Sequence, residues 1–220
     1  MNVIARLKGN YLLFLFYLIV IAIATTILFY FSGQDIYLYI NKLNSPFFDA
    51  FFKYITILGT FAFIGPIILL LTFKSVKVAV TASLASLIAM LMTQLGKFVI
   101  WPDSPRPKVV FESLNNLHFV DGVRLNSSHS FPSGHTTGAF ALLIVIALFS
   151  KKQYTKYICL FFAILVGYSR IYLSQHFLVD VTVGSLLGTV SALLCYLWIA
   201  NPSNKPRPWL EKSFRLPLKK

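Results

Sequence analysis

The sequence predicts an all-α integral membrane protein, a single domain over residues 1–220 built as a bundle of six transmembrane helices. Composition is the first observation: 57% of the 220 residues are hydrophobic and 12% are charged, which is more apolar than an ordinary soluble domain. The second is the recurrence of apolar stretches about 20 residues long, the length that crosses a bilayer. The third is that basic and acidic residues gather on alternate connections between these stretches.

The expected spans lie at residues 11–31, 51–73, 78–100, 136–150, 154–173 and 177–200. Arg6 and Lys8 precede the first as in a signal peptide, but it is long for one and lacks an A-x-A-like cleavage site, so we expect it to be retained. The fourth is short and extends back to Ser133, the expected N-cap. In the sixth, Gly184 and Gly188 favour close helix packing in lipid.

The segment between the first two spans, residues 34–49, carries four aromatic residues, Tyr37, Tyr39, Phe47 and Phe48. Aromatic side chains collect where a membrane meets water, so we interpret this segment as an interfacial belt. The alternative is that these rings select a lipid ligand.

The net charge of +13 is unevenly distributed. Thirteen of the 20 Lys and Arg residues lie at the termini or after the second and fourth spans: Arg6, Lys8, Lys74, Lys77, Lys151, Lys152, Lys156 and six in the basic tail, residues 201–220. With six spans these segments share one side, which the positive-inside rule makes cytoplasmic. The opposite side holds six of the seven acids: Asp35, Asp49, Asp103, Glu112, Asp121 and Asp180. The charge therefore reflects topology, and no basic run interleaved with aromatics indicates nucleic-acid binding.

No metal or other cofactor is expected. Cys159 and Cys195 lie inside apolar stretches without paired spacing, and neither a C-x-x-C nor an H-E-x-x-H pattern occurs. The seven carboxylates are too dispersed for a two-metal site.

Polar residues interrupt the apolar sequence between Ser169 and Asp180. Charged groups in such a position are costly and usually functional. His176 and Asp180 are four residues apart, so on a helix they share a face, and the carboxylate can accept the proton of one ring nitrogen while the other stays free to attack. An interhelical polar contact is the alternative for Arg170 and His176.

Other polar residues fall at the same expected end of the spans. Lys97 and Arg106 bracket a proline-rich turn, and Phe131-Pro132-Ser133-Gly134-His135 opens the fourth span, where free backbone N–H groups favour an anion. With Arg170 they describe a pocket for a multiply charged oxyanion, most simply phosphate. One histidine would attack phosphorus and the other would protonate the leaving oxygen.

These residues resemble the signature of the type 2 phosphatidic acid phosphatases (PAP2), the lipid phosphate phosphatase and vanadium haloperoxidase superfamily. Its P-S-G-H motif stands here as Pro132 to His135, and its S-R-x5-H-x3-D motif as Ser169 to Asp180. The first motif, usually K-x6-R-P, departs, because eight residues separate Lys97 from Arg106-Pro107. The motifs cover residues 97–180, and three in order are a specific signal.

The resemblance implies a PAP2-like fold and a role for each residue. His176 would be the nucleophile that forms a phosphohistidine, Asp180 would orient it, and His135 would be the general acid. The phosphoryl oxygens would be held by five groups: Lys97, Arg106, Ser133, the Gly134 amide and Arg170. His118, His129, Arg124 and Lys108 are interpreted as surface or interfacial residues instead.

The expected function is therefore metal-independent hydrolysis of a lipid phosphate or diphosphate at the outer, periplasmic face of a bacterial inner membrane. Undecaprenyl diphosphate, phosphatidylglycerol phosphate, phosphatidate and lipid A phosphate all fit, and the motifs choose none of them because they recognise only phosphate. A lipid-linked phosphotransferase with the same histidine and a non-catalytic lipid-binding or transport protein are the alternatives. The haloperoxidase branch is soluble and does not fit a membrane chain. No oligomeric state is indicated.

Overall fold

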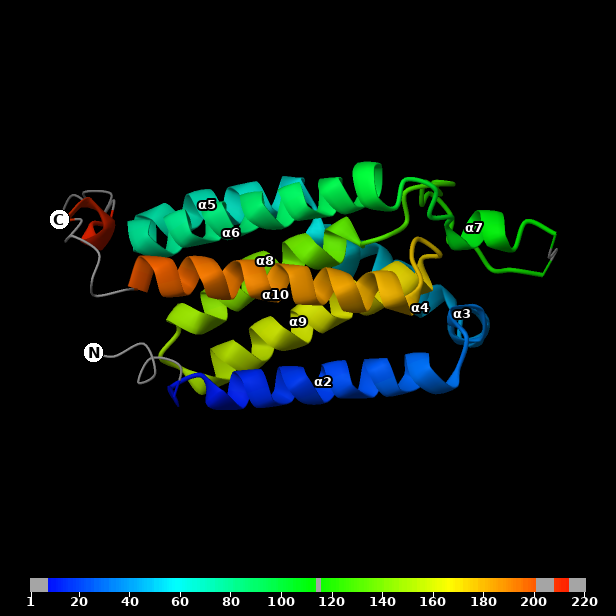
Figure 1. Cartoon of the computed structure of the whole chain (residues 1–220), viewed down its shortest axis with the longest axis horizontal. Helices are drawn as coiled ribbons and strands as arrows, with labels where there is room; N and C mark the ends of the chain where they lie inside the picture. Colours follow the sequence, from blue (N-terminus) through cyan, green and yellow to red (C-terminus); the bar gives the residue numbers. More distant parts are fainter. Residues whose placement is uncertain (1–7, 114–115, 201–207, 214–220) are drawn as a thin grey trace.

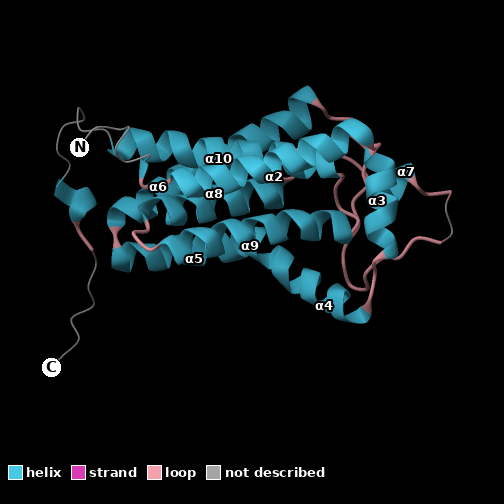
Figure 2. Ribbon diagram, turned by 90° about the horizontal axis from the view of Figure 1, so that it is seen from below, coloured by secondary structure: helices cyan, strands magenta, loops and turns pink. Residues whose placement is uncertain are grey.

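The computed structural model describes residues 8–113, 116–200 and 208–213, and within them every regular element is a helix (Figure 2). The α-helices are α2 (Tyr11–Tyr30), α3 (Gly33–Lys42), α4 (Pro46–Ile55), α5 (Phe61–Lys74), α6 (Val76–Leu95), α7 (Pro107–Val110), α8 (Gly134–Phe149), α9 (Gln153–Tyr172) and α10 (Leu178–Ala200). Shorter turns of other helix types are η1 (Thr56–Gly59), η2 (Gly96–Ile100) and η3 (Pro208–Glu211). The predicted all-α class is confirmed for this part of the chain.

Helix α8 is the centre of the bundle, and α6, α9 and α10 pack around it (Figure 1). Ten of its 16 residues are buried, among them Phe140, Leu142 and Val145. A helix that is apolar on every side buries all of its faces against neighbours. The first turn of α8, which carries P-S-G-H residues, is therefore fixed by the packing of the whole helix.

Gly184 and Gly188 pack closely against a neighbouring helix, as predicted, and that helix is α8. A Cβ atom added at Gly184 would lie 2.8 Å from the carbonyl oxygen of Ser133, and one at Gly188 would lie 2.7 Å from Cβ of Phe140. Any side chain at these positions would push the two helices apart. The glycines thus set the distance between the two helices that carry His135 and Asp180.

The number of spans is only partly supported. Three helices are long and apolar enough to cross a membrane, Tyr11–Tyr30, Val76–Ile100 and Leu178–Ile199, and the described part of the chain offers up to four if a bent pair counts as one span. That pair, Pro46–Gly59 and Phe61–Lys74, is bent by 54°. Helix α8 is apolar but shorter. Helix α9 carries two cations, Lys156 and Arg170.

The second expected span is therefore not one continuous helix. It breaks at η1, where the hydroxyl of Thr60 donates to the carbonyl oxygen of Ile57 at 2.7 Å. A Cβ atom at Gly59 would lie 2.5 Å from the carbonyl oxygen of His135. Only glycine tolerates so close an approach, so the break brings the chain against the start of α8.

Residues 34–49 form most of α3 and the start of α4 at the loop end of the bundle (Figure 2). The belt interpretation is wrong for Tyr37, which is fully buried, stacks on Phe111 and shares a hydrogen bond with the hydroxyl of Ser174 at 2.8 Å. Tyr39 and Phe47 are exposed, as a belt requires. Tyr37 is buried because α3 lies across the turn that leads into α10.

The two ends of the bundle differ in charge. One end holds the start of α2, the end of α10, and Lys74, Lys77, Lys151 and Lys152 (Figure 1). There Lys77 pairs with Glu211 at 2.7 Å. Of the basic tail, only Lys212 lies among the described residues, and Arg6 lies outside them.

Replacing Gly184 by alanine should destabilise the protein, because the new Cβ meets backbone that cannot move without shifting α8. Overpacking of this kind costs about 1–3 kcal/mol of unfolding free energy. The matched control is Gly65→Ala, because a Cβ there meets nothing within 4 Å. The thermal unfolding midpoint of both variants in detergent checks this, and equal midpoints would contradict it.

Candidate active site

His176 is held at the turn between α9 and α10. The backbone N–H groups of Gln175 and His176 both donate to the carbonyl oxygen of Arg170, at 3.0 and 3.1 Å. This double contact requires a left-handed residue, which is Ser174 with φ of 57°. The turn therefore holds the backbone of His176 against that of Arg170.

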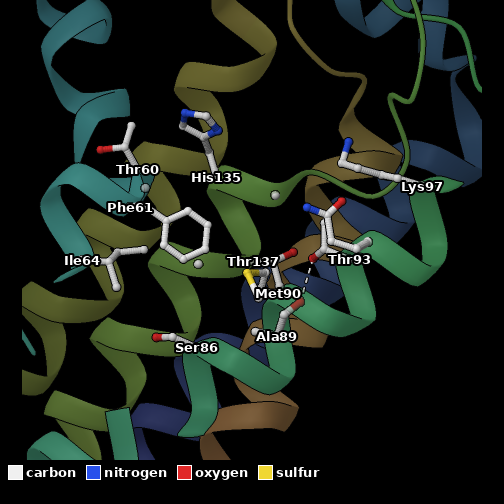
Figure 3. A pocket seen from close by; sticks show the side chains of 14 residues that line it. Thr60, Phe61, Ile64, Ser86, Ala89, Met90, Thr93, Lys97, His135 and Thr137 are labelled. Atoms are coloured by element: carbon white, nitrogen blue, oxygen red, sulfur yellow. Dashed lines mark hydrogen bonds between the residues drawn. The ribbon is translucent and has the colours of Figure 1, made fainter. Parts of the chain in front are cut away.

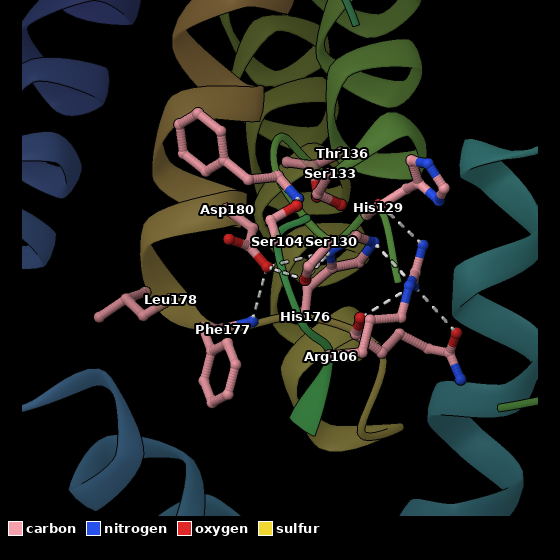
Figure 4. Close-up of polar contacts among 12 residues, drawn as sticks. Ser104, Arg106, His129, Ser130, Ser133, Thr136, His176, Phe177, Leu178 and Asp180 are labelled. Atoms are coloured by element: carbon pink, nitrogen blue, oxygen red, sulfur yellow. Dashed lines mark hydrogen bonds and ion pairs between the residues drawn. The ribbon is translucent and has the colours of Figure 1, made fainter. Parts of the chain in front are cut away.

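The imidazole of His176 is part of a buried three-residue cluster (Figure 4). Its Nδ1 lies 3.2 Å from Oδ2 of Asp180 and 3.3 Å from Oγ of Ser130. Ser130 donates its hydroxyl to the same Oδ2, which also accepts from the N–H of Phe177 at 3.0 Å. A carboxylate oxygen facing Nδ1 favours the tautomer protonated there, which leaves Nε2 with its lone pair.

Burial and positive neighbours keep the His176 ring neutral. Burial is the largest cause that holds its pKa well below the ordinary value, followed by the charges of Arg170, Arg106 and Lys97. A neutral ring with a free nitrogen is what a nucleophile or base requires.

Arg106 reaches Nε2 from the outer loop. Its Nη1 lies 3.4 Å from Nε2 of His176 and donates to the carbonyl oxygen of Gln175 at 2.9 Å. Its Nε donates to the carbonyl oxygen of Ser128 at 2.9 Å. Burial lowers the pKa of Arg106, and Asp180 opposes that shift.

Lys97 and Arg106 meet at one carbonyl group despite the eight residues between them. Lys97 and Nη2 of Arg106 both donate to the carbonyl oxygen of His129, the latter at 3.3 Å. His129 has a φ of 56°, a strained value for a residue with a side chain. Lys97 lies in the π turn η2, and π turns are frequent at functional sites.

The longer segment between Lys97 and Arg106 makes hydrogen bonds to the loop that carries Ser130. The N–H of Ser130 donates to the carbonyl oxygen of Ser104 at 3.1 Å, and the N–H of Phe131 donates to the hydroxyl of Ser104 at 3.0 Å. The N–H of Arg106 also donates to the carbonyl oxygen of Ser127 at 3.1 Å. The enlarged turn thus pairs with the segment that precedes P-S-G-H.

Ser104, Ser130 and Gln175 were not identified from the sequence. Ser130 stands two residues before Pro132, and that proximity is its only sequence signal. Ser104 and Gln175 act through backbone groups of segments far away in the chain, so no spacing rule finds them.

The guanidinium group of Arg170 is only partly hydrogen-bonded by the described residues. Its Nη1 donates to the hydroxyl of Thr56 at 2.7 Å, while its buried Nε has no partner among the described residues. Buried hydrogen-bond donors are almost always paired in native proteins, so an unpaired buried donor indicates a place where a ligand binds. An anion oxygen would satisfy it.

The start of α8 supplies further donors. Ser133 is the N-cap residue, as predicted, and its hydroxyl bonds to that of Thr136 at 2.9 Å and not to a backbone N–H of the first turn. Its own N–H donates to the carbonyl oxygen of Asp180 at 3.1 Å. Within the described ranges the N–H groups of Gly134 and His135 have no protein acceptor. These are the anion-binding groups of a helix start.

His135 lines a mainly apolar cavity of about 240 Å³ between α5, α6 and α8 (Figure 3). His135 and Lys97 line one end of it, and Ser86 and Ala89 line the other end (Figure 3). Lys97 also lines a polar, solvent-facing hollow of about 420 Å³ with Arg106 and His129. A polar and an apolar cavity therefore adjoin at Lys97.

His118, interpreted from the sequence as a surface residue, contacts another part of the chain. Nε2 of His118 lies 2.9 Å from Oδ2 of Asp49. The backbone N–H of His118 donates to Oδ1 of Asn41 at 3.0 Å. His118 thus fastens the outer loop to α3 and α4. Among the described residues no group of three His, Cys, Asp or Glu side chains is arranged to hold a metal ion.

Comparison with known proteins connects these motifs to a family. The family model described as the PAP2 superfamily matches residues 78–203, more than half of the chain. The chain is 28% identical over 172 residues to the lipid A 4'-phosphatase of Porphyromonas gingivalis, covering 74% of this chain and 71% of that protein. It is 30% identical over 126 residues to the undecaprenyl-diphosphatase of Sulfolobus acidocaldarius, covering 55% of each.

A solved structure agrees with the fold. The crystal structure of the first transmembrane PAP2 type phosphatidylglycerolphosphate phosphatase from Bacillus subtilis is similar with a TM-score of 0.65 and 26% identity, covering 90% of this chain and 99% of that one. The matched regions span 34% to 71% of the length of the first three curated relatives.

The protonation state of His176 can be measured by NMR, because the chain has four histidines and so gives few ring signals to separate. We expect ¹⁵N NMR of ring-labelled protein to show one ring that stays neutral and protonated at Nδ1 as the pH falls from about 8 to about 6, since its pKa lies below the ordinary value of about 6.5. The signal is assigned by its loss in His176→Gln. A midpoint at or above about 6.5, or a proton on Nε2, would contradict the geometry.

Proposed function

Because the chain belongs to the PAP2 superfamily, we propose that it is a membrane lipid phosphatase that acts through a phosphohistidine at His176. The observation that carries the proposal is a buried, neutral histidine whose free Nε2 faces Arg106, beside the unpaired Nε of Arg170. Named lipid phosphatases among the relatives support it.

In the first step, Nε2 of His176 attacks phosphorus as the bond to the lipid oxygen breaks. Asp180, which faces Nδ1 at 3.2 Å, stabilises the positive charge that the ring acquires. Arg170, Arg106, Lys97 and the free N–H of Gly134 stabilise the phosphoryl oxygens. His135, protonated beside the bound anionic phosphate, gives that proton to the leaving oxygen and becomes neutral.

In the second step, water attacks the phosphohistidine and the N–P bond breaks. His135, which has lost its proton, accepts one from the water, so both histidines return to their first states. Inorganic phosphate leaves through the polar hollow lined by Arg106 and His129. The balance needs only water, so no metal or other cofactor is part of this mechanism.

The two adjoining cavities support a lipid substrate. A phosphate held at Lys97 would have solvent on one side and the apolar cavity lined by Ile64, Ala89 and Met90 on the other. An amphiphile matches such a surface, because its headgroup and its chain require opposite surroundings. Lipid A phosphate, undecaprenyl diphosphate, phosphatidylglycerol phosphate and phosphatidate share this form.

The topology that accompanies this function has six spans, with α8 and α9 crossing the membrane beside the longer helices. The lysines at one end support a cytoplasmic location for that end and for both termini. The site would then face the periplasm in a bacterial inner membrane, where the headgroup of an outer-leaflet lipid reaches it. Cysteine labelling at Lys108 and Lys151 from each side of the membrane tests this arrangement.

Replacing His176 by alanine should reduce phosphate release to the uncatalysed level with every lipid, because no other group forms the covalent intermediate. The measurement is phosphate release by purified protein with the four lipids named above. His118→Asn is the control, since His118 lies outside the cluster around His176. Turnover by His176→Ala with any of them would contradict the proposed nucleophile.

The same assay separates hydrolysis from transfer. Adding an acceptor lipid and analysing the products shows whether phosphate goes to water or to the acceptor. Binding without release from any of the four would favour a non-catalytic lipid-binding protein.

Ser130→Ala should lower kcat by about 10- to 100-fold, because a hydrogen bond to a charged group contributes about 1.5–3 kcal/mol. KM should change little, since Ser130 contacts Asp180 and His176 and lies outside the anion pocket. Ser113→Ala, an exposed serine of the outer loop, is the matched control. A raised KM with an unchanged kcat would show that Ser130 binds substrate instead.

A further inference from the structure

A third cavity lies at the end of the bundle away from His176. It has a volume of about 560 Å³ and opens between the α5–α6 and α8–α9 connections. Helix α8 runs from one site to the other, and its 16 residues separate them by about 24 Å. The cavity is therefore not part of the site around His176.

Its walls are divided into an apolar and a basic part. Leu71, Val78, Ile146 and Phe149 form the apolar wall between the helices. Lys74, the last residue of α5, and Lys151 and Lys152, in the α8–α9 connection, line the cavity where these helices end, with the hydroxyl-bearing Ser75 and Ser150. This division suits a molecule with one apolar and one anionic part.

The basic side is not neutralised by the protein. Among the described residues none of these three lysines pairs with a carboxylate, and the nearby ion pair joins Lys77, which does not line the cavity, to Glu211. Three exposed cations around one hollow repel one another. An anion between them would remove that repulsion.

The turn that presents two of the lysines is fixed. The hydroxyl of Ser150 accepts from the N–H of Lys152 and donates to its carbonyl oxygen, both at 3.2 Å. Lys152 also lies over the ring of Tyr154, 5.6 Å from its centroid. These local contacts set the position of Lys152, and Lys151 lies between Ser150 and Lys152 in the same turn.

We infer that this cavity binds one anionic glycerophospholipid, with its phosphodiester headgroup among Lys74, Lys151 and Lys152 and an acyl chain along the wall formed by Ile146 and Phe149. Basic pockets between transmembrane helices bind anionic headgroups in this way. The lipid would come from the leaflet opposite the site at His176. The inference does not depend on the proposed phosphatase activity.

The test measures the lipid that the full chain retains after purification in detergent, by native mass spectrometry with added phosphatidylglycerol. The variant is Lys151→Gln/Lys152→Gln. Its matched control is Lys42→Gln/Lys108→Gln, which removes the same charge from exposed lysines at the other end. We expect the variant to bind phosphatidylglycerol about tenfold or more weakly than the wild type and the control.

Three outcomes would overturn the inference. Equal binding by variant and wild type would show that the lysines make no site. Equal retention of phosphatidylcholine would show that the lipid only surrounds the bundle. Displacement by millimolar inorganic phosphate would show an anion site without a lipid. None of them bears on His176, because binding is measured without turnover.

Discussion

The structure depends most on one residue, Asp180. Its carboxylate faces Nδ1 of His176 and accepts hydrogen bonds from the hydroxyl of Ser130 and the N–H of Phe177. Its backbone carbonyl accepts a hydrogen bond from the N–H of Ser133. One residue thus joins the turn after α9, the loop before α8 and the first turn of α8. If the carboxylate were lost, the buried ring and hydroxyl would each lose a partner, and buried polar groups without partners are costly. The same residue thus sets the orientation of His176 through its carboxylate and the position of the helix start through its backbone carbonyl.

The positive charges around this carboxylate are held mainly by uncharged groups. Arg106 lies against the carbonyl oxygens of Gln175, Ser128 and His129, and Lys97 lies against that of His129. Carbonyl groups orient a cation without cancelling its charge. The pocket therefore keeps a positive potential that a second carboxylate would remove, and a buried site with such a potential favours an anion. The strained backbone of His129 is the local cost of placing one carbonyl between two cations.

Much of this arrangement follows from sequence. The spacing of His176 and Asp180 brings them together because α10 begins between them. The four-residue interval of the glycines predicts close packing of α10, and the structure shows that α8 is the partner. Ser130 and Ser104 were not predictable, because they bond to segments 50 and 26 residues away through loop backbone that has no period. The break at Gly59 and the burial of Tyr37 depend on which surface packs against them. A hydropathy pattern records how apolar a segment is and leaves its neighbour undetermined.

The contacts of Lys97 and Arg106 with backbone carbonyls also bear on which substrate the proposed reaction accepts. A phosphate that enters must take donors away from neutral carbonyl oxygens that already accept them. Hydrogen bonds to charged oxygens are about twice as strong as those between neutral groups, so a dianionic terminal phosphate gains from this exchange. A phosphodiester, with one charge and bulk on both sides, gains less and also has to fit the buried Nε2 of His176. The same carbonyls that orient Lys97 and Arg106 would thereby favour terminal phosphates over the phosphodiesters that make up the surrounding bilayer.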